Sequence, residues 1–213
     1  MRTDDLVTML ATGAGTVQPN QAARRCATAV GWGIAGAALL MTILLGPRHD
    51  LAAAIMLPMF WAKVAFVTSL AAASLLAAWR LSRPGVSLAW VPGVLGAPVL
   101  AIWLLAAIVL MRADAAQRKA LFFGDTWNSC PFLIALISAP VFVAVVWAMK
   151  GLAPTRLRLA GAAAGMLSGA VATTVYSVHC PELAPPFIGF WYLLGVLIPT
   201  AVGTLLGPRL LRW

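Results

Sequence analysis

The chain has 213 residues, of which 62% are hydrophobic and only 10% are charged. A soluble domain carries about 25% charged residues, so this composition excludes an ordinary soluble globule. The formal net charge of +9 does not indicate a nucleic-acid-binding protein, because the sequence holds no soluble basic domain that could bind it. We therefore expect an integral membrane protein that makes no direct contact with nucleic acid.

Six apolar runs are long enough to cross a bilayer, since a transmembrane helix needs about 20 consecutive apolar residues. Their content of Ala, Leu and Gly fits helices rather than barrel strands, in which apolar and polar residues alternate. The sequence predicts an all-α fold, a bundle of six transmembrane helices with a short cytoplasmic N-terminal segment. The expected spans are 26–45, 57–79, 88–111, 130–149, 159–179 and 187–206.

The positions of Lys and Arg predict the orientation, because cytoplasmic loops are enriched in these residues. With six spans, both termini share one side with the second and fourth loops. That side carries ten Lys and Arg residues, against four on the other. We therefore expect a bacterial inner-membrane protein, embedded in the lipid bilayer, with both termini in the cytoplasm. The chain divides into a cytoplasmic segment, 1–25, and a transmembrane domain, 26–213.

Two of the three cysteines precede a proline. Cys130 begins the fourth span and Cys180 ends the fifth. These spans form a hairpin, so the two thiols should share the non-cytoplasmic end, with Cys26 in the opposite, reducing compartment. Pro131 suits the first position of a helix, which makes Cys130 the expected helix cap, where a thiol ionises more easily. Pro181 disfavours helical geometry at Cys180, so the fifth span should end near it.

Three interpretations of the cysteine pair remain open: small residues packed at helix ends, a structural disulfide, or a redox- or metal-responsive pair. A disulfide needs Cα atoms within about 7 Å, whereas helix axes pack about 8–10 Å apart, so bridging requires a local approach. A soft metal held by both thiolates and His179 tolerates a wider gap, and His179 could also help a thiolate to form. No complete set of ligands in the sequence requires a metal.

Lys63 is the only ionisable side chain well inside a span. A charge there costs at least ~2.5 kcal/mol on insertion scales, so we expect this lysine to have a structural or functional role. It could snorkel towards the interface, or meet Glu182 and connect the thiols to the bundle. As an alternative function, it could mark a small transporter, although the internal repeats typical of transporters are absent. A thiol-active membrane protein is a further alternative, but no cofactor motif or catalytic cluster is present, so we expect no enzyme and no cofactor.

Gly161, Gly165 and Gly169 recur every four residues along the fifth span. Small residues at this spacing allow transmembrane helices to approach closely. The sequence therefore predicts close packing of this span, the one that ends in Cys180, against a neighbour.

The N-terminal segment has the pattern of a short amphipathic helix. Acids are favourable in the first turn of a helix, and apolar residues at helical spacing share one face. Residues 13–21 then break the helix and form a flexible link. Such a helix could dock into a groove of a basic partner protein, or it could be no more than a frayed tail. The residues concerned are Asp4, Asp5, Leu6, Met9 and Leu10.

Several motifs together resemble one known family. They are the opening "MRTDDLVTMLA", "PMFWAKVAF" in the second span, "SCPF", "YSVHCPE" and the closing "GTLLGPRLLRW". In combination with six spans and a short N-terminal segment, they resemble the NrsF-type anti-sigma factors, or negative regulators of sigma F. The resemblance covers nearly the whole chain.

The resemblance implies a function. Such a protein holds an extracytoplasmic-function sigma factor at the membrane, away from RNA polymerase, and releases it under heavy-metal or oxidative stress. Two periplasmic cysteines sense the stress, and in this sequence they are Cys130 and Cys180, whereas Cys26 is not part of the pair. The N-terminal segment becomes the expected sigma-binding element. The sequence does not indicate an oligomeric state.

Overall fold

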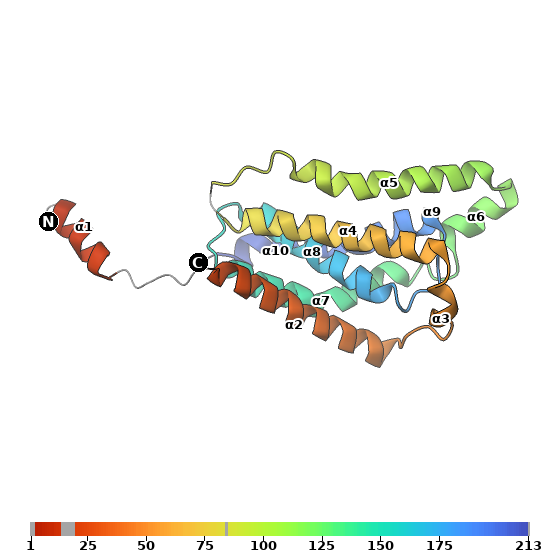
Figure 1. Cartoon of the computed structure of the whole chain (residues 1–213), viewed down its shortest axis with the longest axis horizontal. Coiled ribbons are helices and arrows are strands. Elements are labelled where there is room, and N and C mark those ends of the chain that lie inside the picture. The colour runs from red at the N-terminus through yellow and green to blue at the C-terminus, as the bar shows by residue number, and fades with distance from the viewer. Residues whose placement is uncertain (1–2, 14–19, 84, 213) are drawn as a thin grey trace.

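The computed structural model describes residues 3–13, 20–83 and 85–212, and all regular structure in these ranges is helical. Within them, six helical segments are long and apolar enough to cross a membrane, so the predicted all-α fold with six spans is confirmed (Figure 1). The sixth segment is continuous but contains one π-helical turn, η1. The spans are α2 (Gln21–Leu44), α4 (Pro58–Leu81), α5 (Val91–Arg112), α7 (Cys130–Lys150), α8 (Leu157–Tyr176), and the run of α9 (Pro185–Phe187), η1 (Ile188–Tyr192) and α10 (Leu193–Leu210).

Some predicted boundaries are wrong by a few residues. Helix α2 begins at Gln21, five residues before the expected start of the first span. Cys130 is the first residue of α7 and not its cap, which is Ser129. Helix α8 ends at Tyr176, and a hydrogen bond of 3.0 Å from Cys180 N to Tyr176 O closes the turn that follows. The short helices α3 (Leu51–Ala54) and α6 (Ala115–Phe123) connect spans and were not predicted.

Helix α8 is the centre of the bundle. In an 18-residue window of α8, 72% of the residues are buried, against 11% in α5. It packs against α10, α4 and α7, while α2 packs mainly on α7. A structural change at either end of α8 would therefore act on the helices that pack against it, α10, α4 and α7.

The predicted close packing of α8 is confirmed, and its partner is α10. A Cβ atom at Gly165 would collide with the backbone carbonyl of Pro199, and one at Gly161 would collide with that of Gly203. At Gly169 it would lie 2.8 Å from Val196 Cα. Glycine is thus required at these positions because the two backbones touch, as small residues at four-residue spacing permit.

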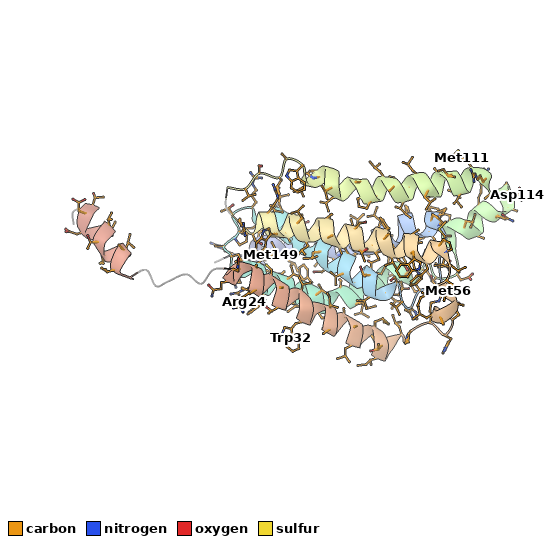
Figure 2. The ribbon with its side chains drawn as sticks, viewed as in Figure 1. Arg24, Trp32, Met56, Met111, Asp114 and Met149 are labelled. Atoms are coloured by element: carbon orange, nitrogen blue, oxygen red, sulfur yellow. The ribbon has the colours of Figure 1, made fainter. Side chains whose placement is uncertain are left out.

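Large apolar side chains project outward from the sides of the bundle. Trp32 is 78% exposed and Met111 is 72% exposed, and both stand away from the helices (Figure 2). Such a surface is unusual for a soluble monomer and suits contact with lipid chains.

The two ends of the bundle differ and are named here by their contents. The thiol end holds Cys130 and Cys180, and the terminal end holds the start of α2 and the end of α10 (Figure 1). Helix α1 (Thr3–Gly13), as predicted, has Asp4 and Asp5 in its first turn. Most of the expected link, residues 14–19, lies outside the described residues.

Candidate functional site

The site at the thiol end is built around two buried cysteines. Cys130 and Cys180 are both 0% exposed, and neither forms a disulfide. The two thiols lie within hydrogen-bonding reach of each other. The α7–α8 hairpin brings them together, because one begins the first helix and the other follows the second. The predicted placement of both cysteines at one end is confirmed.

Two buried tyrosines lie beside the thiols. Tyr176, in the last turn of α8, and Tyr192, in the π-helical turn, have ring centroids 6.0 Å apart. Both influence the ionisation of Cys180, so both lie close to it. Tyr192 is 0% exposed, yet its hydroxyl forms no hydrogen bond with any described residue. A buried hydroxyl without a partner is unusual, and π-helical turns frequently occur at functional sites.

Lys63 contributes a positive charge to the site. Its side chain is 0% exposed, and Nζ donates to Cys180 O at 2.9 Å and to Glu182 O at 3.1 Å. The snorkelling alternative is therefore wrong. The expected meeting with Glu182 occurs through the backbone carbonyl and not the carboxylate. Among the described residues, no carboxylate lies within salt-bridge distance of Lys63.

Glu182 directs its carboxylate to a different segment. Its Oε1 accepts a hydrogen bond of 2.8 Å from Asp125 N, in the turns between α6 and α7. Gly124, with a φ of +55°, leaves room for this carboxylate, since a Cβ there would lie 2.6 Å from Oε1. In the same segment, Thr126 Oγ1 is 4.0 Å from Cys180 Sγ. The turns around residues 124–129 therefore cover the thiols and are held in place by Glu182.

The loop after α2 holds the opposite side of the cysteine turn. His179 Nδ1 lies 2.8 Å from Gly46 O, so this nitrogen carries the proton and donates. Arg48 lies 3.3 Å from Pro181 O and forms an ion pair of 2.6 Å with Asp50. The arginine lowers the pKa of the Asp50 carboxyl through this bond. His179 is thus engaged through Nδ1 with the backbone of the loop after α2.

The structure does not assemble the predicted metal ligands. In residues 3–13, 20–83 and 85–212, no three side chains of His, Cys, Asp or Glu gather where they could hold a metal ion. His179 is held through Nδ1 by Gly46 O and does not gather with both cysteines in such a group. Cys130 and Cys180 remain as two soft ligands close together.

The surroundings favour the thiolate at Cys180. The hydrogen bond from Cys130 lowers the pKa of the Cys180 thiol well below its usual value, against the opposing effect of burial. The positive charge of Lys63 lowers it further. A nearby cation and hydrogen bonds to the charged form both have this effect, and the thiolate is the reactive form of cysteine.

The chain is similar to known proteins along its whole length. The family model described as "NrsF: Negative regulator of sigma F" matches residues 10–213. The chain belongs to the NrsF family. It is 64% identical, over the full length of both chains, to the "Probable anti-sigma-F factor NrsF" of Azospira oryzae. It is 41% identical, again over both full lengths, to the "Anti-sigma-F factor NrsF" of Caulobacter vibrioides. No solved structure matches it.

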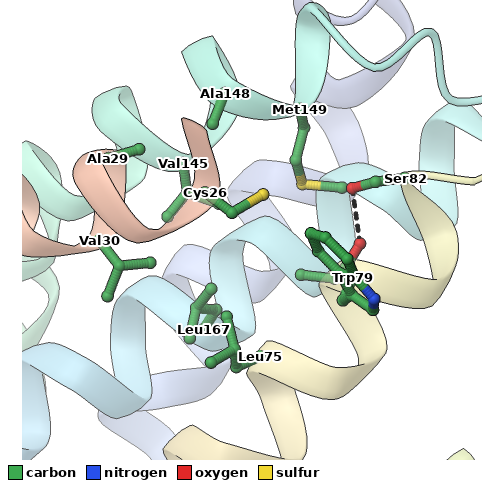
Figure 3. A pocket seen from close by; sticks show the side chains of 11 residues that line it. Cys26, Ala29, Val30, Leu75, Trp79, Ser82, Val145, Ala148, Met149 and Leu167 are labelled. Carbon is green, nitrogen blue, oxygen red and sulfur yellow. Dashed lines mark hydrogen bonds between the residues drawn. The ribbon is translucent and has the colours of Figure 1, made fainter. Parts of the chain in front are cut away.

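The third cysteine of this NrsF-family chain lies in different surroundings. Cys26, in the first turns of α2, is half-buried and points into a small cavity between α2, α4 and α7 (Figure 3). The cavity has a volume of about 20 Å³, room for about one water molecule. Apolar side chains line it almost entirely, and Ser82 there donates to Ala78 O in its own helix. Cys26 is well separated from the other thiols, as the sequence indicated.

Sequence reasoning missed several residues of this NrsF-family site. Tyr176, Tyr192, Thr126 and Arg48 were not predicted to surround the cysteines. Tyr176 carried a signal, because it stands one helical turn before Cys180, on the same side of the chain. Tyr192 and Arg48 carried none, since only the tertiary fold brings the π-helical turn and the α2–α3 loop to the thiols.

Proposed function

We propose that this chain is a membrane anti-sigma factor. It holds an extracytoplasmic-function sigma factor at the bacterial inner membrane and releases it when an oxidant or a heavy metal acts on Cys130 and Cys180. The observation that carries this proposal is the pair of free, adjacent, buried thiols at the end opposite the termini, in a chain of a family of negative regulators of sigma F. Family membership favours this function over a small transporter or another thiol-active membrane protein.

The distribution of charge supports the orientation of this proposal. All acids of the bundle, which are Asp50, Asp114, Asp125 and Glu182, lie outside the terminal end, which carries Arg and Lys alone. By the positive-inside rule the terminal end faces the cytoplasm, where a sigma factor is found. The thiol end then faces the periplasm, in which disulfides persist.

Helix α8 offers a route between the two ends. Its C-terminal turn carries the cysteine segment, and its N-terminal half touches α10 through Gly161 and Gly165. Moving an equilibrium from 1:99 to 99:1 takes about 5.5 kcal/mol, and a disulfide contributes about 2–4 kcal/mol. Oxidation therefore supplies about a third to three quarters of the shift, and competition from RNA polymerase for the free sigma factor adds to it by mass action.

Helix α1 is the proposed sigma-binding element, residues 1–25 being the cytoplasmic segment. Its apolar residues are unburied in this structure: Leu6 is 38% exposed, Met9 is 61% and Leu10 is 63%. Asp4 and Asp5 precede them in the first turn. An amphipathic helix with a free apolar face fits a groove on a partner protein, and the acids suit a basic one.

Capture of the sigma factor tests this function. The full-length protein in detergent is immobilised and presented with extracytoplasmic-function sigma factors, first any whose gene adjoins that of this chain. We expect capture by the wild type and at least tenfold weaker capture by Leu6→Asp/Leu10→Asp. Thr8→Ala is the matched control, because the Thr8 hydroxyl donates to Asp4 O in its own helix. If the wild type captures no sigma factor, the proposed function is wrong.

A further inference from the structure

We propose that the two thiols have different roles: Cys180 is the thiol that an oxidant attacks, Cys130 is the thiol that resolves the product, and Lys63 is the residue that positions and activates Cys180. This inference rests on the proposed function, because it assigns roles within the same thiol pair. The relevant oxidant is a peroxide, which transfers one oxygen atom to a thiolate.

The contacts of Lys63 single out Cys180. A fully buried ammonium group needs compensating partners, and here it has two backbone carbonyls, those of Cys180 and Glu182. Among the residues that the structure describes, no carboxylate lies within salt-bridge distance of it. The remaining anion available to it is a thiolate. Because Lys63 is bonded to the backbone of Cys180 itself, its charge stays beside that residue.

The groups that face Cys180 come from six parts of the chain besides its own turn. The thiol of Cys130 lies beside its sulfur, Thr126 Oγ1 lies 4.0 Å away, and Arg48 is close enough for the two charges to interact. Together they supply donors and cations, and the nearby carboxylate of Glu182 is engaged with Asp125 N. The titratable and charged groups around Cys180 are Cys130 of α7, Tyr176 of α8, Tyr192 of η1, Lys63 of α4, Arg48 of the α2–α3 loop, and the neighbours His179 and Glu182.

Cys130 suits the resolving role. It is the first residue of α7 and is fixed by the helix, whereas Cys180 lies in a turn that is held by the side chains of Lys63 and Arg48 and by the backbone N–H of Asp125. The cationic side chains of Lys63 and Arg48 both bond to the backbone of Cys180 and not of Cys130, so the negative charge is favoured on Cys180. Its sulfur already lies within bonding reach of Cys180, so no helix has to move far for a disulfide to form.

The reaction proceeds in two balanced steps. The Cys180 thiolate attacks one oxygen of the peroxide, the O–O bond breaks, and the products are a Cys180 sulfenic acid and hydroxide, which takes up a proton to form water. The sulfur of Cys130 then attacks Cys180 Sγ. The S–O bond breaks, and the proton of Cys130 leaves with that oxygen as a second water molecule. The pair is oxidised by two electrons and the peroxide is reduced by two.

Site-resolved labelling of the full-length protein in detergent tests these roles. Iodoacetamide labelling from pH 5 to pH 9 is quantified by mass spectrometry for each cysteine, and sulfenic acid formed by hydrogen peroxide is trapped with dimedone. In Cys130→Ser we expect dimedone on Cys180, because the serine hydroxyl still donates to it. In Cys180→Ser we expect none on Cys130.

Substitutions of Lys63 test whether this residue activates Cys180 or only supports the fold. We expect Lys63→Met to slow labelling of Cys180 at pH 7 by roughly tenfold and to move its pH midpoint upward, since an adjacent cation shifts a pKa by about 1–3 units. Lys63→Arg should restore most of the rate because it keeps the charge. Ser74→Ala, a buried polar residue on the same helix, and the labelling of Cys26 serve as controls that should not change.

Two results would overturn the assignment. One is dimedone on Cys130 in Cys180→Ser at the level found on Cys180 in Cys130→Ser. The other is an unchanged pH profile of Cys180 in a folded Lys63→Met protein. Neither result removes the proposed function, which is tested separately by the capture of the sigma factor and its release on oxidation. If both thiols are oxidised alike and release still occurs, only the division of roles is wrong.

Discussion

The two ends of the bundle each hold cysteine, but in different chemical surroundings. At the thiol end, Cys180 lies among a thiol, two tyrosines and the ammonium group of Lys63. At the terminal end, Cys26 borders a small cavity lined almost entirely by apolar side chains (Figure 3). Cys180 is the more buried of the two. Burial alone therefore does not decide the chemistry of a thiol; the donors and cations around it do.

The largest expected effect is the loss of the folded bundle, which would disrupt the thiol end and the terminal end together. In Gly165→Leu the new side chain meets the backbone of Pro199 and Thr200, so α8 and α10 must separate. Overpacking typically costs about 1–3 kcal/mol, and a collision with backbone should exceed that range. We expect no monodisperse protein in size-exclusion chromatography. Gly31→Leu is the control, because nothing lies within 4 Å of that position, and it should behave as the wild type.

The second-largest expected effect is a difference in oxidation between the cysteines of the two ends. After treatment with hydrogen peroxide, we expect one intramolecular disulfide between Cys130 and Cys180, because their sulfurs are already adjacent. Cys26 should stay reduced. Non-reducing peptide mapping measures all three residues in one sample. A disulfide between Cys26 and either Cys130 or Cys180 would contradict the structure, since Cys26 lies near the terminal end and the other two cysteines lie at the thiol end.

A smaller effect is expected from loosening the cover of the thiol end. Glu182→Ala removes the acceptor for Asp125 N, and with it a charge-assisted bond of about 1.5–3 kcal/mol. The turns around residues 124–129 should then open more often, and iodoacetamide should label Cys180 several-fold faster at pH 7. Arg118→Ala, on nearby helix α6, is a suitable control for a change of surface charge. An unchanged rate would mean that these turns do not limit access.

The smallest effect is expected at Tyr192. Its hydroxyl is buried and has no hydrogen-bond partner in the described chain, so Tyr192→Phe removes a group whose burial is uncompensated. Thermal unfolding in detergent should show a free energy of unfolding within about 1 kcal/mol of the wild type, or slightly higher. A clear loss of stability would instead indicate that the hydroxyl binds a partner.

The sequence was sufficient to predict the six spans and the placement of Cys130 and Cys180 at the same end of the bundle. Apolar length identifies membrane helices reliably, because the bilayer fixes the length that they need. The hairpin between the fourth and fifth spans then places Cys130 and Cys180 together without further information. The stripe of Gly161, Gly165 and Gly169 predicted a close contact, although its partner, α10, depends on the arrangement of the whole bundle.

The sequence was not sufficient for the polar contacts of the site. Lys63 was identified as unusual, but its actual acceptors are backbone carbonyls, which every residue carries and no pattern can single out. His179 is adjacent to Cys180 along the chain, yet it bonds to Gly46 O because of the way the α2–α3 loop folds over the turn. The π-helical turn that places Tyr192 beside the thiols has no recognised signal in the sequence.

The most direct test of this account is the release of the sigma factor, measured together with the state of the thiols. The complex with the full-length protein is formed in detergent and treated with hydrogen peroxide or cadmium, and the bound sigma factor and the disulfide content are measured in the same sample. The account predicts release from the wild type and from Cys26→Ser, and retention by Cys130→Ser/Cys180→Ser. Equal release from the double variant would contradict it.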